Sequence, residues 1–139
     1  MFGSDYSASP FGGGRNAYHA VQVGTGVDGA SPHQLISMLF DGLIDCIAQA
    51  RGAMRAKKIE EKGRAISRAV RIVDEGLKAG LNLKDGGELA ARLNDLYAYL
   101  ALRLTQANRH NDEAALDECA QLIEPLRSAW AEIAIKTAA

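Results

Sequence analysis

The residues that could carry out acid–base or metal chemistry are few and widely spaced. The 139-residue sequence has three histidines, His19, His33 and His110. A di-iron carboxylate bundle needs paired Glu-x-x-His motifs, and none of these histidines has a glutamate three residues before it. Phosphate-loop, His-Glu-x-x-His and nucleophile motifs are missing as well. We therefore predict no catalytic, metal-binding or cofactor-binding residue, no cofactor, and a protein that is not an enzyme.

One glycine pattern resembles a dinucleotide-binding loop. The segment Gly24-Thr25-Gly26-Val27-Asp28-Gly29 matches the Gly-x-Gly-x-x-Gly spacing. That spacing binds a pyrophosphate only when it lies between a strand and a helix of a parallel sheet. Since no strands are predicted downstream, a flexible linker is the better interpretation.

The two cysteines suggest a reducing compartment. Cys46 and Cys119 fall on the core faces of separate predicted helices, without Cys-x-x-Cys spacing, which favours buried free thiols over a disulfide or metal site.

The charge balance argues against a nucleic-acid or membrane partner. The net charge is -1, with acids and bases mixed along the chain, so neither nucleic acid nor a membrane surface is an expected partner. The N-terminus does not resemble a secretion signal, and no run of apolar residues reaches membrane-spanning length. We expect a cytoplasmic protein without stable membrane insertion.

Helical periodicity predicts the elements that carry these residues. The first helix should run from Ser31 to about Met54, because Ser31 is a preferred N-cap, Pro32 suits the first helical position and Gln34 completes a capping box. Three further helices are predicted near 59–81, 88–109 and 112–135. Pro125 should kink or split the last of these.

Each of the later helices shows one apolar face. The predicted core positions of the second helix are Ile59, Ile66, Val70, Val73, Leu77 and Leu81. Those of the third are Leu89, Leu93, Leu96, Tyr97, Leu100, Leu104 and Ala107. Those of the fourth are Leu116, Cys119, Leu122, Ile123, Leu126, Trp130 and Ile133. Helices of twenty-odd residues with short links predict an all-α fold, an antiparallel four-helix bundle over residues 31–136.

The N-terminal segment differs in composition from the rest. Residues 1–14 are rich in glycine and serine and are predicted to be a disordered tail. Residues 15–30 form an apolar arm and linker, in which the spacing of Tyr18, Val21 and Val23 fits a short helix and a strand equally well. We expect this arm to be mobile.

The first helix has more apolar surface than a bundle helix needs. Its apolar side chains run round well over half of its circumference, which predicts either a central helix wrapped by its neighbours or an edge that binds a partner. The edge in question comprises Ile36, Phe40, Ile44 and Ile47. The second helix has a run of small residues that fits either close helix packing or the floor of the same groove. The run comprises Ala65, Ala69, Gly76 and Gly80 and is interrupted by Ile72. Tyr99 and Leu102 point away from the core face of the third helix. They are either ordinary exposed apolar residues or the lip of the same groove.

Specific motifs also resemble a known family. They are Asn16-Ala17-Tyr18, the segment from Ala30 through Ser31-Pro32-His33-Gln34-Leu35 to Gly42, Gly76-Leu77-Lys78-Ala79-Gly80-Leu81, Gly86-Gly87-Glu88, Leu96-Tyr97-Ala98-Tyr99, Ala107-Asn108 and Trp130. In this combination the chain resembles the FliS family, the flagellin-binding export chaperones of bacterial flagella. The resemblance covers nearly all of the chain after the N-terminal tail.

The resemblance implies a cytoplasmic chaperone of flagellar type III secretion that binds the C-terminal segment of flagellin. Binding in an apolar groove would prevent premature polymerisation, and the family also implies contacts with the flagellar export gate and with flagellar regulators. It associates Tyr18 with cargo binding, and Val21 lies beside it on the arm. The expected partner-binding residues are Tyr18, Val21, Ile36, Phe40, Ile44, Ile47, Ala65, Ala69, Ile72, Tyr99 and Leu102. The alternative is a homo-oligomeric structural or adaptor protein that uses the same apolar face on itself.

Overall fold

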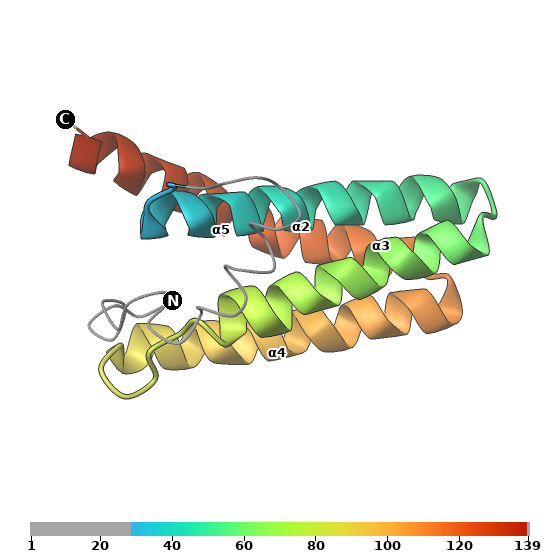
Figure 1. Ribbon diagram of the computed structural model, residues 1–139. Helices are drawn as coiled ribbons and strands as arrows, with labels where there is room; N and C mark the ends of the chain where they lie inside the picture. Colours follow the sequence, from blue (N-terminus) through green and yellow to red (C-terminus); the bar gives the residue numbers. More distant parts are fainter. Residues whose placement is uncertain (1–28, 139) are drawn as a thin grey trace.

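The described chain is a bundle of four long helices. The computed structural model describes residues 29–138, with side chains to residue 133. The helices are α2 (Pro32–Arg55), α3 (Ile59–Arg71), which continues as the π-helix η2 (Ile72–Lys78), α4 (Gly87–His110) and α5 (Glu113–Ala138). Successive helices run in opposite directions (Figure 1). The predicted all-α antiparallel bundle is confirmed, whereas the predictions for residues 1–14, Tyr18 and Val21 lie outside the described residues.

The helices form a closed ring of neighbours. α2 packs against α3 and α5, and α4 packs against α5 and against α3 with η2. α2 and α4 are therefore diagonal to each other across the core. The ring has four seams, and each seam can be described by the side chains that meet there.

The first helix begins where the sequence predicted. Ser31 Oγ accepts a hydrogen bond from Gln34 N at 3.1 Å, and Gln34 Oε1 accepts one from Ser31 N at 2.8 Å. These two bonds form a capping box, which satisfies backbone donors that the first turn of a helix leaves free. Pro32 follows at the first helical position, where its missing N–H costs nothing.

Three predicted core residues lie at the surface instead. Ile59 is 71% exposed, Leu89 is 67% exposed and Ile133 is 47% exposed. Ile59 and Leu89 lie in the first turns of their helices, and Ile133 lies near the end of α5. Periodicity gives the direction in which a side chain points, but not whether a neighbouring helix extends that far.

The second predicted helix changes its winding at Ile72. Over η2 the backbone adopts π-helical bonding, in which a carbonyl accepts from the N–H five residues on, and Ala79 N still donates to Asp74 O at 3.0 Å. The element ends at Lys78 rather than near Leu81. α5, by contrast, is continuous through Pro125, so the predicted split does not occur.

Small residues on this element permit close packing against α2. A Cβ placed on Gly76 would lie 3.0 Å from Leu39 Cδ2, and one on Gly42 would lie 3.5 Å from Ile72 Cδ1. Ala65 and Ala69 are buried. At Gly76 the missing side chain is what lets Leu39 pack directly on the backbone.

Lys62 is the buried charged side chain of the described residues. Its Nζ donates to Asn108 O at 2.9 Å and to Asn111 Oδ1. Asn111 ends α4 in the left-handed conformation, with φ 51°. The lysine thus satisfies acceptors at the C-terminus of α4, where a positive charge is favourable.

Two glycine substitutions should change stability in opposite directions. Gly63→Ala, in the interior of α3 with no heavy atom within 4 Å of the added Cβ, should raise the free energy of unfolding by about 0.5–1 kcal/mol. In Gly86→Ala the added Cβ would lie 2.4 Å from Asn82 O, so stability should fall by about 1–3 kcal/mol. Urea unfolding followed by circular dichroism measures both, and equal effects would contradict the packing described at Gly86.

Candidate functional site

The predicted partner-binding edge of α2 is mostly interior. Ile36, Phe40 and Ile47 are at most 3% exposed, and only Ile44 is half-buried. The wide apolar arc of α2 is therefore largely covered in the folded chain. Placing a carboxylate at Phe40 would bury a charge in the core, so such a substitution would test folding rather than a surface.

The α2 edge lies on the side of the helix that faces α5. Asp41 pairs with Arg127 of α5 at 2.9 Å, and Arg55 Nε donates to Glu113 of α5 at 2.5 Å. Ile44 is three residues after Asp41 and eleven before Arg55, which places all three on one side of the helix. Ile44 is therefore the half-exposed apolar residue of the α2–α5 seam.

The predicted trough of small residues lies on the opposite side of α2. Ala65 and Ala69 are buried, and Ile72 is half-buried and lies against Gly42. This is the α2–α3 seam. The structure thus does not bring the α2 edge and the trough together as the two walls of one groove.

Tyr99 and Leu102 lie exposed on α4, as the sequence predicted. Tyr99 is 39% exposed and Leu102 is 54% exposed. Because they are three residues apart, they are neighbours on the helix surface. The exposed pair is therefore available to a partner without any change in the bundle.

A polar network fixes the Tyr99 ring at the α4–α5 seam. The Tyr99 hydroxyl donates to Glu118 of α5, and Arg103 Nε donates to the other carboxylate oxygen of Glu118 at 2.9 Å. The hydrogen bond from Tyr99, with that from Arg103, lowers the pKa of Glu118 below its ordinary value, and the same bond raises the pKa of Tyr99. A charged acceptor thus holds the ring in one orientation beside Leu102. The helical wheel predicted that Tyr99 is exposed, but not this network.

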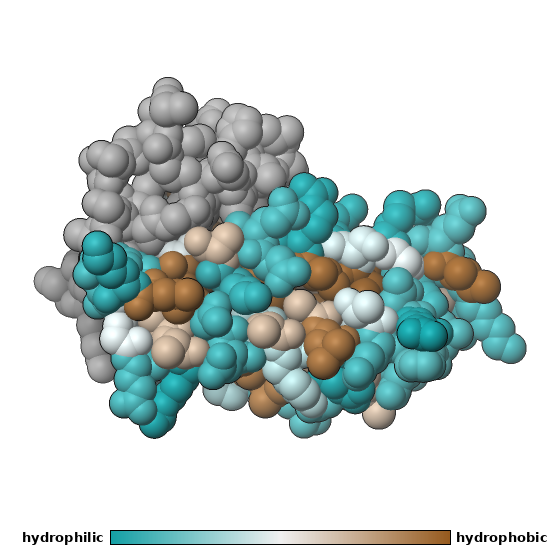
Figure 2. All heavy atoms as spheres, turned by 90° about the horizontal axis from the view of Figure 1, so that it is seen from below, coloured by the Kyte–Doolittle hydropathy of each residue, from teal (hydrophilic) through white to brown (hydrophobic). Residues whose placement is uncertain are grey.

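Exposed apolar side chains are dispersed over the bundle. Figure 2 shows several small apolar patches separated by hydrophilic side chains on the face seen from below. The exposed large apolar residues of the described chain are Ile59, Leu83, Leu89, Tyr99, Leu102 and Ile133. On this face the apolar surface is divided into short stretches, which suits contact with an amphipathic helix at several separate points.

His33 and Trp130 join the start of α2 to the later part of α5. Their rings stack with centroids 4.4 Å apart and an angle of 8° between the planes. Trp130 Nε1–H donates to His33 O at 3.0 Å, and His33 Nε2 lies 3.0 Å from Trp130 O. Trp130, which was predicted on the apolar face of the last helix, is half-buried and packs against the core. Residues 97 apart in the chain give no sequence signal for such a pair.

The described residues do not suggest a metal centre. Among residues 29–138, no three His, Cys, Asp or Glu side chains cluster so that they could hold an ion. Within the same range, none of the helices is long and apolar enough to cross a membrane.

Comparison with known proteins gives a consistent result. The family model described as flagellar protein FliS matches residues 14–137. The chain is 44% identical to the flagellar secretion chaperone FliS of Salmonella typhimurium, over 94% of both chains. It is 42% identical to the flagellar secretion chaperone FliSB of Pseudomonas aeruginosa, over 81% of this chain and 89% of the relative. The flagellar secretion chaperone FliS of Bacillus subtilis is 32% identical over 84% of both chains.

Both thiols are buried and free, as predicted, and should be unreactive in the folded protein. Burial raises the pKa of Cys46, and raises that of Cys119 from an ordinary 9.0 to about 11. The Cys119 thiol of the unfolded chain loses its proton at a lower pH than the buried thiol of the folded protein does. The stability that comes from this difference is therefore complete below about pH 9 and is lost as the pH rises to about 11. Urea unfolding at several pH values should show stability falling over this range by up to about 2–3 kcal/mol.

The matched control is Cys119→Ala, compared over the same pH range. This variant should be less stable overall because of the cavity, but its loss of stability above about pH 9 should be smaller. An identical pH dependence in both proteins would show that Cys119 does not titrate as its burial requires.

Proposed function

Because the chain belongs to the flagellar protein FliS family, we propose that it is an export chaperone for flagellin. In this proposal the protein acts in the cytoplasm and binds the C-terminal helical region of flagellin. Binding prevents premature polymerisation and aids delivery of flagellin to the flagellar type III export apparatus. A chaperone is not a class of enzyme, and the proposal includes no catalytic step.

The observation that carries the proposal is the extent of the similarity. An identity of 44% over 94% of both chains relates this chain to a flagellar secretion chaperone along almost its entire length. The family model begins at residue 14, so the arm with Tyr18 is part of the match. The physical character of the bundle supports it, because an α-helical client can be held by apolar side chains spaced along a helix.

We propose the exposed residues as the first contacts of the client. Tyr99 and Leu102 are open on α4, and Ile44 and Ile72 are half-exposed at two seams of α2. Tyr18 and Val21 of the arm complete this set. Because the points on α2 and α4 lie on different seams of the bundle, a client would have to wrap round it to bury them all, whereas Tyr99 and Leu102 can be covered by one amphipathic helix.

The buried members of the predicted site have a different part in the proposal. They are Ile36, Phe40, Ile47, Ala65 and Ala69. A client can contact them only if it displaces the neighbouring helix that covers them. This requires that the client binds such an opened conformation of the bundle more tightly than the closed conformation of the structure. Their substitution affects the stability of the free protein as well as binding.

Leu102→Asp should weaken binding of the C-terminal flagellin segment while leaving the bundle folded. Removing a leucine side chain from an apolar contact costs about 1.5–3 kcal/mol, so the dissociation constant should rise about tenfold or more. Isothermal calorimetry measures the constant, and circular dichroism checks the fold. The control is Leu89→Asp, because Leu89 is a leucine of the same helix with similar exposure. If Leu89→Asp weakens binding as much as Leu102→Asp does, the contact is not specific to Tyr99 and Leu102.

Tyr18→Ala tests the arm. In the full-length chain it should weaken one-to-one binding of the same flagellin segment, because the arm then offers the client less apolar surface. The mass in solution should be measured with and without the segment. Failure of the unaltered protein to bind any flagellin segment, together with self-association, would favour the homo-oligomeric alternative.

A further inference from the structure

A groove lies between α2 and α3 at the end of the bundle where the two helices are joined. Its volume is about 490 Å³, which is in the range of small binding sites. Small residues form its floor: Gly52, Ala53, Ala56 and Ala65. A floor without large side chains lets the groups of a partner approach the backbone closely.

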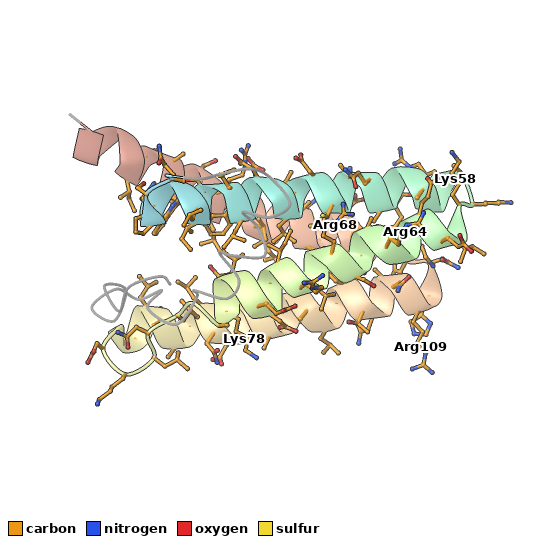
Figure 3. All side chains as sticks on the ribbon, in the orientation of Figure 1. Lys58, Arg64, Arg68, Lys78 and Arg109 are labelled. Carbon is orange, nitrogen blue, oxygen red and sulfur yellow. The ribbon has the colours of Figure 1, made fainter. Side chains whose placement is uncertain are left out.

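The walls of this groove are mainly cationic. They are formed by Gln49, Lys58, Glu61, Arg64 and Arg68. Three of these side chains are positive and one is negative, although the whole chain has a net charge of -1. Figure 3 shows Lys58, Arg64 and Arg68 following one another along the α2–α3 seam, while Lys78 and Arg109 lie on the side of α4. We call this feature the basic groove.

The cations of the basic groove are poorly paired within the chain. Arg64 Nη1 lies 3.9 Å from Glu60, and both side chains are well exposed. Arg68 lies beside Cys46 and opposes the rise in the pKa of its thiol that burial causes, and in the described chain neither Arg68 nor Lys58 forms an ion pair. Of the other described arginines, Arg109 has no carboxylate oxygen within 3.0 Å, whereas six do: Arg51, Arg55, Arg71, Arg92, Arg103 and Arg127. The charges in the groove are thus left for an external anion.

Lys58 occupies a position where a cation is unfavourable. It is the N-cap of α3, and its side chain makes no capping hydrogen bond. The N-terminus of a helix carries a partial positive charge, so a lysine there opposes the helix dipole, whereas Ser, Thr, Asp or Asn would add about 1 kcal/mol. Glu60 and Glu61 already place negative charge in this first turn, and a bound carboxylate would pair with Lys58 and with the free N–H groups there.

We propose that the basic groove binds a short, acidic, helical segment of a partner protein. Arg64 and Arg68 are four residues apart, or about 6 Å along the helix axis. Carboxylates at i and i+4 of a partner helix have the same spacing and can pair with them, while a third reaches Lys58. Three cations interrupted by Glu61 suit a few carboxylates better than the continuous charge of a nucleic acid.

The basic groove is separate from the client contacts proposed on α4. It lies on the α2–α3 seam, whereas the Tyr99 network lies on the α4–α5 seam across the bundle. The two seams can be occupied at the same time, although Ala65 of the groove floor is also one of the buried residues proposed to contact the client in an opened conformation. The groove is therefore a site for a second partner, and its existence does not depend on the identity of the client.

A matched pair of peptides tests the proposal on the full-length chain. The first is an alanine-based helical peptide with glutamates at i, i+4 and i+8 and a fluorescent label, and the second has glutamine at those positions. Fluorescence anisotropy should show saturable one-to-one binding of the glutamate peptide, at least about tenfold weaker binding of the glutamine peptide, and weaker binding as salt increases from about 50 to 500 mM. Equal binding of both peptides, or no saturable binding, would overturn the proposal.

Variants locate the binding on the protein. Arg64→Gln, at a well-exposed position, and the double variant Arg64→Gln with Arg68→Gln should each weaken binding of the glutamate peptide, the double variant by about tenfold or more. The control double variant Lys78→Gln with Arg109→Gln removes the same charge elsewhere and should change binding less than twofold. An equal loss in the control would mean that net charge alone attracts the peptide.

Two further measurements separate the alternatives. Arg64→Glu should bind a peptide with lysine at the three positions more tightly than the unaltered protein does, since the charge pair is then reversed. A single-stranded oligonucleotide that binds more tightly than the glutamate peptide, and depends on Arg64, would overturn the assignment to an acidic protein segment. Leu102→Asp should bind the glutamate peptide normally, so failure of the flagellin proposal leaves this result unchanged.

Discussion

The structure depends on burial of the wide apolar surface of α2. Nine residues of this helix are buried, and they point in directions that a single neighbouring helix cannot cover. α3 covers one side and α5 covers the other, and α4 closes the ring between them. A helix that packs against one neighbouring surface needs only a single apolar stripe. The apolar arc of α2 is wider and must be covered on more than one side, which requires the closed bundle. The ring then determines which residues meet at each seam.

The seams of α2 are built by different interactions. Toward α3 the backbones approach closely, because Gly76 and Gly42 leave room for Leu39 and Ile72. Toward α5 the contact is edged by ion pairs and by the stack of His33 on Trp130. Nearer the connection between α2 and α3, the seam of these two helices is lined by Gly52, Ala53, Ala56 and Ala65, beside the cations of the basic groove.

The residues proposed to bind partners lie at the margins of this core. The Tyr99 network and Leu102 present an apolar surface fixed by charge-assisted hydrogen bonds, which is suited to an apolar client. The basic groove presents cations over a floor of small residues, which is suited to carboxylates. These two surfaces lie on different seams of the bundle.

The amino-acid sequence by itself determined the family, the all-α bundle, the capped start at Ser31, the buried thiols and the exposure of Tyr99 and Leu102. These features follow from local spacing and from short motifs, which need no knowledge of neighbouring elements. Only the tertiary structure decided that Phe40 is interior, that Ile59 and Leu89 are exposed, and that the two halves of the predicted groove lie on opposite sides of α2. The tertiary structure likewise decided the π-helical winding of η2 and the pairing of His33 with Trp130. The physical reason is that periodicity gives the direction of a side chain on its own helix, whereas burial depends on where the other helices end and how closely they approach.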